Sequence, residues 1–171
     1  MHWWTSVSRG SPQKVRRFIL NGIDLHERYT RNQLALHIVC DGSTNGHVQV
    51  LNMLIDHGAD IHGLDDLENT PLHIAAMKGQ TKLAEILLKR GAKLHCYNTY
   101  LDTPLSLAKW FCQNHRSWHN DTYYLLLKWN GIPRWRAFVK YKKRLREKKY
   151  IWLLWIRHKI SCDISQLVCW L

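Results

Sequence analysis

Apolar residues recur at helical spacing in residues 69–95, which read NTPLHIAAMKGQTKLAEILLKRGAKLH. Thr70 and Pro71 predict a helix start, because a threonine hydroxyl can accept a hydrogen bond from a free backbone N–H and proline is tolerated at the first helical position. Gly79 predicts that this helix ends after about two turns, and Gly91 predicts the end of a second helix. A helix pair this short cannot bury a core alone, so the pattern predicts neighbours on which it stacks.

The same pattern returns on both sides of this segment. The tripeptide Thr-Pro-Leu that begins at Thr70 begins again at Thr103, 33 residues later, and this distance is typical of one class of helical repeat. Toward the N-terminus, residues 54–62 (LIDHGADIH) align with residues 87–95 (LLKRGAKLH), again 33 residues apart. The apolar positions of residues 15–26 match the same pattern once more. The sequence therefore predicts a repeat protein.

Three features, the TPLHIAA motif, the LL-x-x-GA ending and the 33-residue spacing, make the chain resemble the ankyrin repeat family. The resemblance implies an all-α solenoid of stacked helix pairs with short inter-repeat turns. We expect an ankyrin repeat domain over residues 1–132, with repeats at about 1–28, 29–64, 65–97 and 98–132. Ser106 stands where the family pattern has histidine, and residues 113–121 are an insertion in the fourth repeat.

The first repeat is incomplete, because it lacks its turn and the opening of its first helix. This departure is compatible with an atypical terminal repeat, and it also agrees with a fragment of a larger ankyrin-containing protein. We expect Trp3 and Trp4, which lie in this incomplete repeat, to be exposed.

The composition of the chain indicates the cellular compartment in which we expect the protein. Of 171 residues, 46% are hydrophobic, yet no run of about 18 apolar residues could span a bilayer. The first residues show neither the basic region nor the apolar region of a secretory signal. Five cysteines, an odd number without a pattern, favour free thiols in a reducing compartment. We therefore expect a protein of the cytoplasm, the nucleus or both.

Positive charge is concentrated after residue 132. Residues 133–171 hold 11 of the 25 Lys and Arg residues and only two acidic residues. Within this tail, apolar residues between Phe138 and Ile156 fall near a helical stripe beside a dense basic face. The pattern predicts a basic, Trp-rich C-terminal helix.

Four roles are open for this tail. It can cap the last repeat, or carry a nuclear import signal at Lys142, Lys143, Arg144 and Arg146. It can also lie on an anionic membrane surface or enter a calmodulin-like groove through residues 134–160 without crossing the membrane. Binding of nucleic acid is the fourth role, but nucleic acid is not an expected partner because no recognised reader motif accompanies the charge.

Eleven histidines raise the question of catalysis. The resemblance implies that His37 and His73 hydrogen-bond neighbouring turns. Cys112, His115 and His119 have ligand-like spacing, but a structural zinc site needs four ligands and no further pair completes the set, so no metal is expected. A phosphate-binding loop, a nucleophile elbow and paired carboxylates at usable spacing are also missing. We expect neither catalytic residues nor a cofactor.

The resemblance implies that a protein partner binds on the concave face of the repeats. In the ankyrin family, the variable contact positions lie in the turn before the TPLH motif and directly after the first helix. These positions correspond to Arg9 in the first repeat; Thr30, Arg31, Gln33 and Asp41 in the second; Asp66, Leu67, Asn69, Met77 and Lys78 in the third; and Thr99, Tyr100, Asp102, Lys109 and Trp110 in the fourth. Tyr100 and Trp110 are the strongest candidates because aromatic side chains often supply binding energy. The alternative for Trp110 is packing beneath the inserted loop.

The expected function is therefore a non-catalytic adaptor that binds a partner protein on its concave ankyrin surface. A different hypothesis is a regulator directed to the nucleus or a membrane, in which the basic tail makes the primary contact and the repeats only support it.

Overall fold

The structure is a computed structural model that describes residues 2–114 and 121–131. These residues form eight α-helices and one short 3-10 helix, and none of them lies in a β-strand. The helices are α1 (Trp3–Ser8), α2 (Pro12–Leu20), η1 (Thr30–Asn32), α3 (Ala35–Asp41), α4 (Asn45–Asp56), α5 (Pro71–Met77), α6 (Thr81–Lys89), α7 (Pro104–Asn114) and α8 (Asp121–Trp129).

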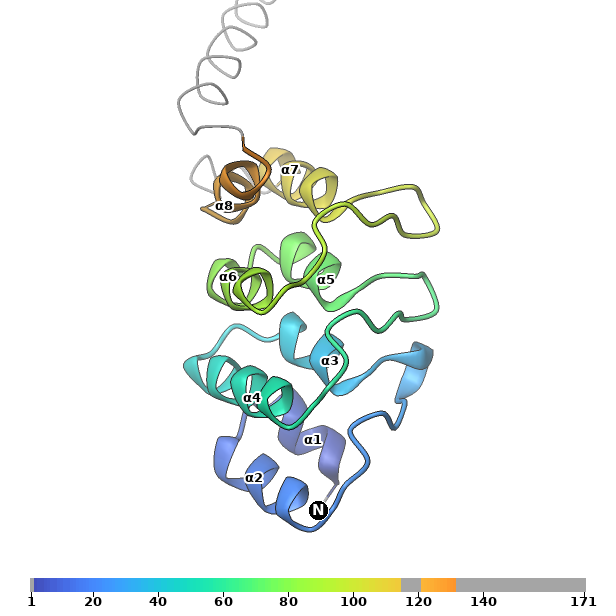
Figure 1. Ribbon diagram of the computed structural model, residues 1–171, viewed down its shortest axis with the longest axis vertical. Coiled ribbons are helices and arrows are strands. Elements are labelled where there is room, and N and C mark those ends of the chain that lie inside the picture. Colours follow the sequence, from blue (N-terminus) through green and yellow to red (C-terminus); the bar gives the residue numbers. More distant parts are fainter. Residues whose placement is uncertain (1, 115–120, 132–171) are drawn as a thin grey trace, which may run out of the picture. The chain divides into compact units, whose positions relative to one another are not determined.

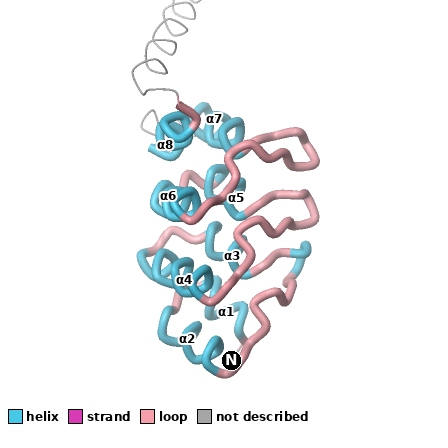
Figure 2. Tube along the Cα trace, in the orientation of Figure 1, coloured by secondary structure: helices cyan, strands magenta, loops and turns pink. Residues whose placement is uncertain are grey.

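Consecutive helices pack in pairs, α1 with α2, α3 with α4, α5 with α6 and α7 with α8. The pairs stack so that α1, α3, α5 and α7 form an inner row and α2, α4, α6 and α8 form an outer row (Figure 1). The long turns between pairs project from the side of the inner row (Figure 2). Each pair buries its apolar faces against its neighbours, as expected for a repeat protein. The prediction of an all-α solenoid is confirmed.

The third helix pair shows how local sequence sets the helix ends. Helix α5 begins at Pro71, and the backbone N–H of Thr70 donates to Nδ1 of His73 at 3.1 Å. Gly79 and Gly91, which follow α5 and α6, have φ angles of 68° and 95°. Glycine adopts this left-handed conformation without steric cost, so it ends each helix. The predicted start and ends of these two helices are confirmed.

The core runs through both rows of helices. Leu72 and Ala75 of α5 are fully buried, as are Leu51 and Leu54 of α4. The small side chain of Ala75 and the larger leucines belong to the same buried apolar cluster. Burying each leucine contributes about 1.5–3 kcal/mol, and these contacts between repeats hold the stack together.

The expectation that Trp3 is exposed is wrong. Its side chain is only 5% exposed, because α2 covers it and the ring of Phe18 packs edge-on against it at 5.7 Å. Trp4 is half-buried and lies 6.1 Å from the Trp3 ring. Among the described residues, the indole N–H of Trp3 is the one buried side-chain polar group without a hydrogen-bond partner.

Several sequence-based expectations lie outside the described residues. These are residues 115–120 of the insertion expected over 113–121, the C-terminal helix, the proposed nuclear signal at Lys142, Lys143, Arg144 and Arg146, and the membrane-surface segment 134–160. The ends of the expected insertion belong to helices, since α7 includes residues 113 and 114 and α8 begins at Asp121. The boundaries of the four repeats stay a prediction. No helix in the part of the chain that the structure describes is long and apolar enough to cross a membrane.

Candidate protein-binding surface

The turns between repeats fold back on themselves and are linked in series. We call them finger 1 (residues 29–33), finger 2 (residues 65–69) and finger 3 (residues 98–102). In each finger, the first residue donates its backbone N–H to the carbonyl of the last, at 2.8–3.1 Å. Between fingers, the N–H of Asp66 donates to the carbonyl of Arg31 at 3.1 Å, and the N–H of Thr99 donates to that of Leu67 at 3.0 Å. The fingers therefore form one hydrogen-bonded series.

A polar side chain at the base of a finger holds the turn in shape. In finger 2, Asp65 is buried, and its Oδ1 accepts the backbone N–H groups of Leu67 and Asn69 at 2.9 and 2.8 Å. In finger 3, Oδ1 of Asn98 accepts the equivalent N–H groups of Tyr100 and Asp102 at 3.0 and 2.9 Å. Asx turns of this kind fix the backbone locally.

Asn69 is not suited to be a contact residue, contrary to the sequence-based expectation. It is only 7% exposed. Its side-chain N–H donates to Asp65 at 3.2 Å, and its side-chain oxygen accepts an N–H of Asn98 at 2.9 Å. Because the amide joins two fingers, it stays inside the protein. We therefore leave Asn69 out of the proposed binding surface.

Two buried histidines fasten the inner helices to the fingers. Nδ1 of His37 accepts the N–H of Leu34 at 3.1 Å, and its Nε2 donates to the carbonyl of Asn69 at 2.9 Å. His73 repeats this arrangement with Thr70 and with the carbonyl of Asp102, each at 3.1 Å. The neutral imidazole with its proton on Nε2 satisfies both partners. These histidines are structural, as predicted.

Burial lowers the pKa of His37 and of His73 below the ordinary value, because it disfavours the charged imidazolium.

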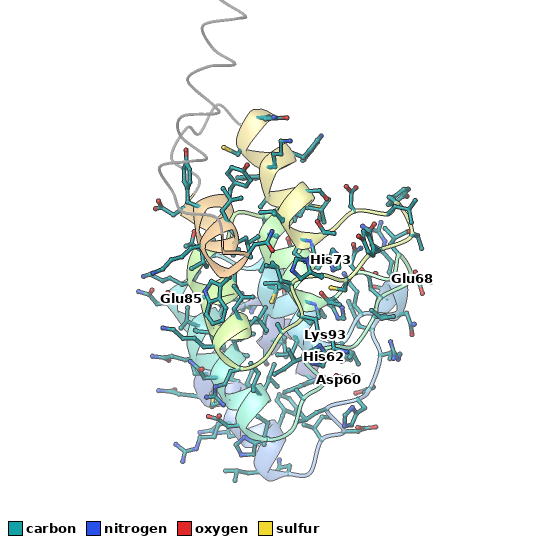
Figure 3. All side chains as sticks on the ribbon, turned by 45° about the horizontal axis from the view of Figure 1, so that its top comes forward. Asp60, His62, Glu68, His73, Glu85 and Lys93 are labelled. Carbon is teal, nitrogen blue, oxygen red and sulfur yellow. The ribbon has the colours of Figure 1, made fainter. Side chains whose placement is uncertain are left out.

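Figure 3 shows His73 inside the stack, whereas Glu68 lies on the finger side and Glu85 on the opposite edge.

Most of the predicted contact positions are exposed. The exposed ones are Arg9, Thr30, Arg31, Asp41, Asp66, Leu67, Lys78, Thr99, Tyr100, Lys109 and Trp110, and the half-buried ones are Gln33, Met77 and Asp102. Tyr100, at 68%, is the most exposed aromatic residue among them. Some of these positions lie on the fingers. The others lie at or just beyond the ends of α1, α3 and α5, or within α7. The predicted positions therefore come from all four helix pairs.

Charge on this surface is partly neutralised. Nζ of Lys78 lies 2.6 Å from Oδ1 of Asp41, which joins the ends of α3 and α5. Both side chains are about half exposed, so the pair contributes only about 0–1 kcal/mol to stability. The side chain of Arg9, in contrast, makes no hydrogen bond or ion pair with any described residue.

A hollow of about 270 Å³ opens where α1, finger 1 and α3 meet, and we call it the aromatic groove. Its lining includes Trp4, Arg9, Tyr29, Gln33, Ile38 and Asp41. The rings of Trp4 and Tyr29 lie 4.9 Å apart at 32°. Sequence reasoning identified Arg9, Gln33 and Asp41 as contacts but missed the two aromatic residues. The spacing of Trp4 and Ser8, four residues apart on one helix face, is the signal that could have revealed Trp4.

The described residues give no structural support for a metal site. Cys112 lies in α7, while His115 and His119 fall outside the described residues. Among residues 2–114 and 121–131, no group of three His, Cys, Asp or Glu side chains is close enough to hold an ion. Cys40 and Cys96 are free thiols, and burial raises the pKa of the Cys40 thiol.

Comparisons with known proteins agree with this architecture. The chain is 37% identical over 82 residues to a probable E3 ubiquitin-protein ligase, XBOS31, of Oryza sativa subsp. japonica, a match that covers 48% of this chain and 16% of the relative. It is 32% identical over 85 residues to mouse ankyrin repeat and SOCS box protein 16, covering 47% of this chain and 19% of the relative. It is also 32% identical over 79 residues to human protein phosphatase 1 regulatory subunit 27, covering 46% of this chain and 49% of the relative.

This chain therefore spans about half or less of the length of each relative. A family model of ankyrin repeats matches residues 3–98 with three copies, which is more than half of the chain. Stacked helix pairs, linked fingers and this match together establish that the chain belongs to the ankyrin repeat family, whose repeats are protein-interaction modules.

Proposed function

We propose that the protein is a non-catalytic adaptor that binds a partner protein on the surface formed by the fingers and the exposed ends of the inner helices. The observation that carries the proposal is the exposure of contact positions from all four helix pairs along one hydrogen-bonded series of fingers. Helical repeats commonly bind through an extended concave face of this kind.

The fingers are organised before a partner arrives. Asp65 and Asn98 hold their turns from within, and the amide of Asn69 ties finger 2 to finger 3. A surface that is already ordered loses little conformational freedom on binding. This rigidity supports a recognition role for the fingers.

Tyr100, Trp110 and Leu67 are the proposed anchors, and Leu67 lies beside finger 3, which contains Tyr100. Leu67 and Tyr100 are close because finger 3 donates to the Leu67 carbonyl through the backbone N–H and the hydroxyl of Thr99, at 3.0 and 3.1 Å. All three anchors are exposed large apolar side chains. Aromatic residues that become buried at an interface often dominate its affinity.

The names of the relatives are compatible with an adaptor role. One relative is named as a regulatory subunit of a protein phosphatase, and another carries a SOCS box in its name. A third relative is named as a probable E3 ubiquitin-protein ligase, but the match covers only 16% of it. We propose that this chain likewise acts through a protein partner in the cytoplasm or nucleus.

The test compares two double variants of the full chain for recovery of bound proteins from cells. Tyr100→Ala with Lys78→Ala removes one anchor and one charge from the proposed surface, and we expect loss of the principal partner. Leu20→Ala with Lys89→Ala is the matched control, since both residues are exposed on outer-row helices. Thermal denaturation first shows that each double variant is folded. The proposal is then contradicted if the Tyr100 and Lys78 variant still recovers the partner, or if both double variants lose it.

The concentration of 11 basic residues in residues 133–171 supports a second candidate. In this hypothesis the tail, including Lys142, Lys143, Arg144 and Arg146, directs the protein to the nucleus or an anionic membrane. Contacts of this kind weaken steeply as salt concentration rises, whereas a mixed protein interface weakens less. Salt dependence of localisation or binding therefore distinguishes the two candidates.

A further inference from the structure

We propose that the aromatic groove binds one apolar side chain of a partner peptide that carries an acidic residue beside it. This inference rests on the proposed function, since it assigns the chemistry of one part of the same surface. It also extends that surface to Trp4 and Tyr29, which lie outside the contact positions expected from the family pattern.

One part of the groove lining is apolar and lies beside the polar side chains of Thr5, Ser8 and Gln33. Trp4, Tyr29 and Ile38 form this part, and the rings of Trp4 and Tyr29 pack 4.9 Å apart. Trp4 is supported by the buried Trp3, whose ring is 6.1 Å away. Tyr29 is 45% exposed, so part of this aromatic surface faces solvent and gains from being covered.

The size of the groove fits a single side chain. Its volume of about 270 Å³ is below the range of about 300–1,000 Å³ that is typical of pockets for small molecules. An aromatic or branched aliphatic side chain can fill such a space while its backbone passes along finger 1. Anchoring of one side chain in a preformed hollow is a common form of peptide recognition.

The charged residues of the groove favour a particular residue beside the apolar side chain of the partner peptide. Two charged residues line the groove, Arg9 and Asp41. Asp41 is paired with Lys78 at 2.6 Å, whereas the guanidinium of Arg9 has no partner among the described residues. The charge left available is therefore positive. A carboxylate is its natural complement, because arginine can bind both carboxylate oxygens at once.

A lysine or methylated lysine is the competing occupant, because aromatic rings and a carboxylate can hold a cation. Two observations oppose it. The rings of Trp4 and Tyr29 are packed on each other at 32° rather than opened as facing walls. Arg9 would also repel a cation, while Lys78 already occupies the Asp41 carboxylate.

The test uses four synthetic peptides in an otherwise Gly/Ser background, containing the pair Phe-Glu, Phe-Gln, Phe-Lys or Ala-Glu. Binding to the full chain is followed by NMR shifts of the Trp4 indole N–H, which is assigned from a Trp4→Phe variant. We expect Phe-Glu to bind about tenfold more tightly than Phe-Lys or Ala-Glu, with Phe-Gln between them.

Variants of the protein make the assignment specific. Arg9→Glu should reverse the order of Phe-Glu and Phe-Lys, and Tyr29→Ser, a change at a partly exposed position, should weaken Phe-Glu about fivefold or more. Arg17→Glu is the matched control, because Arg17 is exposed on α2 and does not line the groove; it should leave the order unchanged.

Three results would overturn the inference: no saturable shift with Phe-Glu at millimolar concentration, no response to Arg9→Glu, or tighter binding of Phe-Lys by the wild-type protein. The last result would assign the groove to a cation. If any of these occurs while the Tyr100 and Lys78 double variant still loses the cellular partner, only this inference fails. If that double variant keeps its partner, the proposed function fails independently.

Discussion

His37 and His73 connect the first turn of one inner helix to the finger of the next repeat. Ser106, at the equivalent position in α7, makes only the local part of this arrangement. Its Oγ accepts the N–H of Thr103 at 2.9 Å and donates to the carboxylate of Asp102 at 2.8 Å. Serine lacks the second ring nitrogen through which His37 and His73 each bond to a carbonyl of the next finger.

Acidification should destabilise the fold through His37 and His73. Their pKa is ordinarily 6.5 and is lowered in the folded state by burial, so the unfolded chain binds more protons between pH 6.5 and the lowered pKa. The stabilisation is therefore present above pH 6.5 and is lost as the pH falls through that window. Urea unfolding at several pH values should show a falling midpoint.

The variant His73→Gln tests whether a buried histidine causes the loss of stability at low pH. It should lower the free energy of unfolding by about 1–3 kcal/mol, because buried polar groups lose a partner, and it should flatten the pH dependence. His62→Gln, at an exposed position, should change neither. An unchanged pH dependence in His73→Gln would show that another group is responsible.

Two substitutions of Trp3 distinguish the contribution of its packed ring to stability from the cost of its unpaired N–H. Trp3→Phe keeps an aromatic ring against Phe18 and removes the buried donor, so we expect unfolding free energy within about 1 kcal/mol of the wild type. Trp3→Ala should cost about 3–5 kcal/mol, because it empties a core position. Thermal or chemical unfolding measures both. Equal losses would mean that the N–H has a partner in solution.

At the scale of elements, the sequence predicts the helices well but the fingers poorly. Pro71, Gly79 and Gly91 mark helix ends by general rules, and the structure agrees with them. The fingers depend on left-handed residues without a glycine signal, such as Glu68 and Leu101, whose φ angles are 57° and 59°. The N–H of Glu68 donates to the carbonyl of Asp65 at 3.0 Å, and the N–H of Leu101 donates to that of Asn98 at 2.9 Å. The bonds that link one finger to the next join residues far apart in the sequence, which a local pattern does not show.

Leu101 should limit the stability of finger 3. It is 79% exposed and left-handed, a conformation that costs a leucine about 1–2 kcal/mol. Leu101→Gly should stabilise the protein by about 0.5–1 kcal/mol, after allowance for the greater freedom of glycine in the unfolded chain. Tyr100→Gly, at the adjacent exposed position with negative φ, should destabilise it. A loss of stability in Leu101→Gly, measured by chemical unfolding, would show that Leu101 makes contacts that outweigh its strain.

At the scale of the whole molecule, repetition explains what could be predicted. A pattern that returns every 33 residues identifies the solenoid, because neighbouring units must share a core. The repetition identifies positions on the proposed binding surface, but it does not show which of these side chains are buried. Asn69 fits the contact pattern and is nevertheless buried between Asp65 and Asn98. The aromatic groove likewise arises only when α1 and finger 1 meet, so the sequence alone did not reveal it.

The most direct test of the account compares the repeat surface with the basic tail in one quantitative recovery experiment. One full-length variant carries Tyr100→Ala and Lys78→Ala, and the other replaces Lys142, Lys143, Arg144 and Arg146 with glutamine. We predict that the first loses the principal protein partner at every salt concentration, while the second still binds it. Retention by the surface variant and salt-sensitive loss by the tail variant would contradict binding on the concave ankyrin surface.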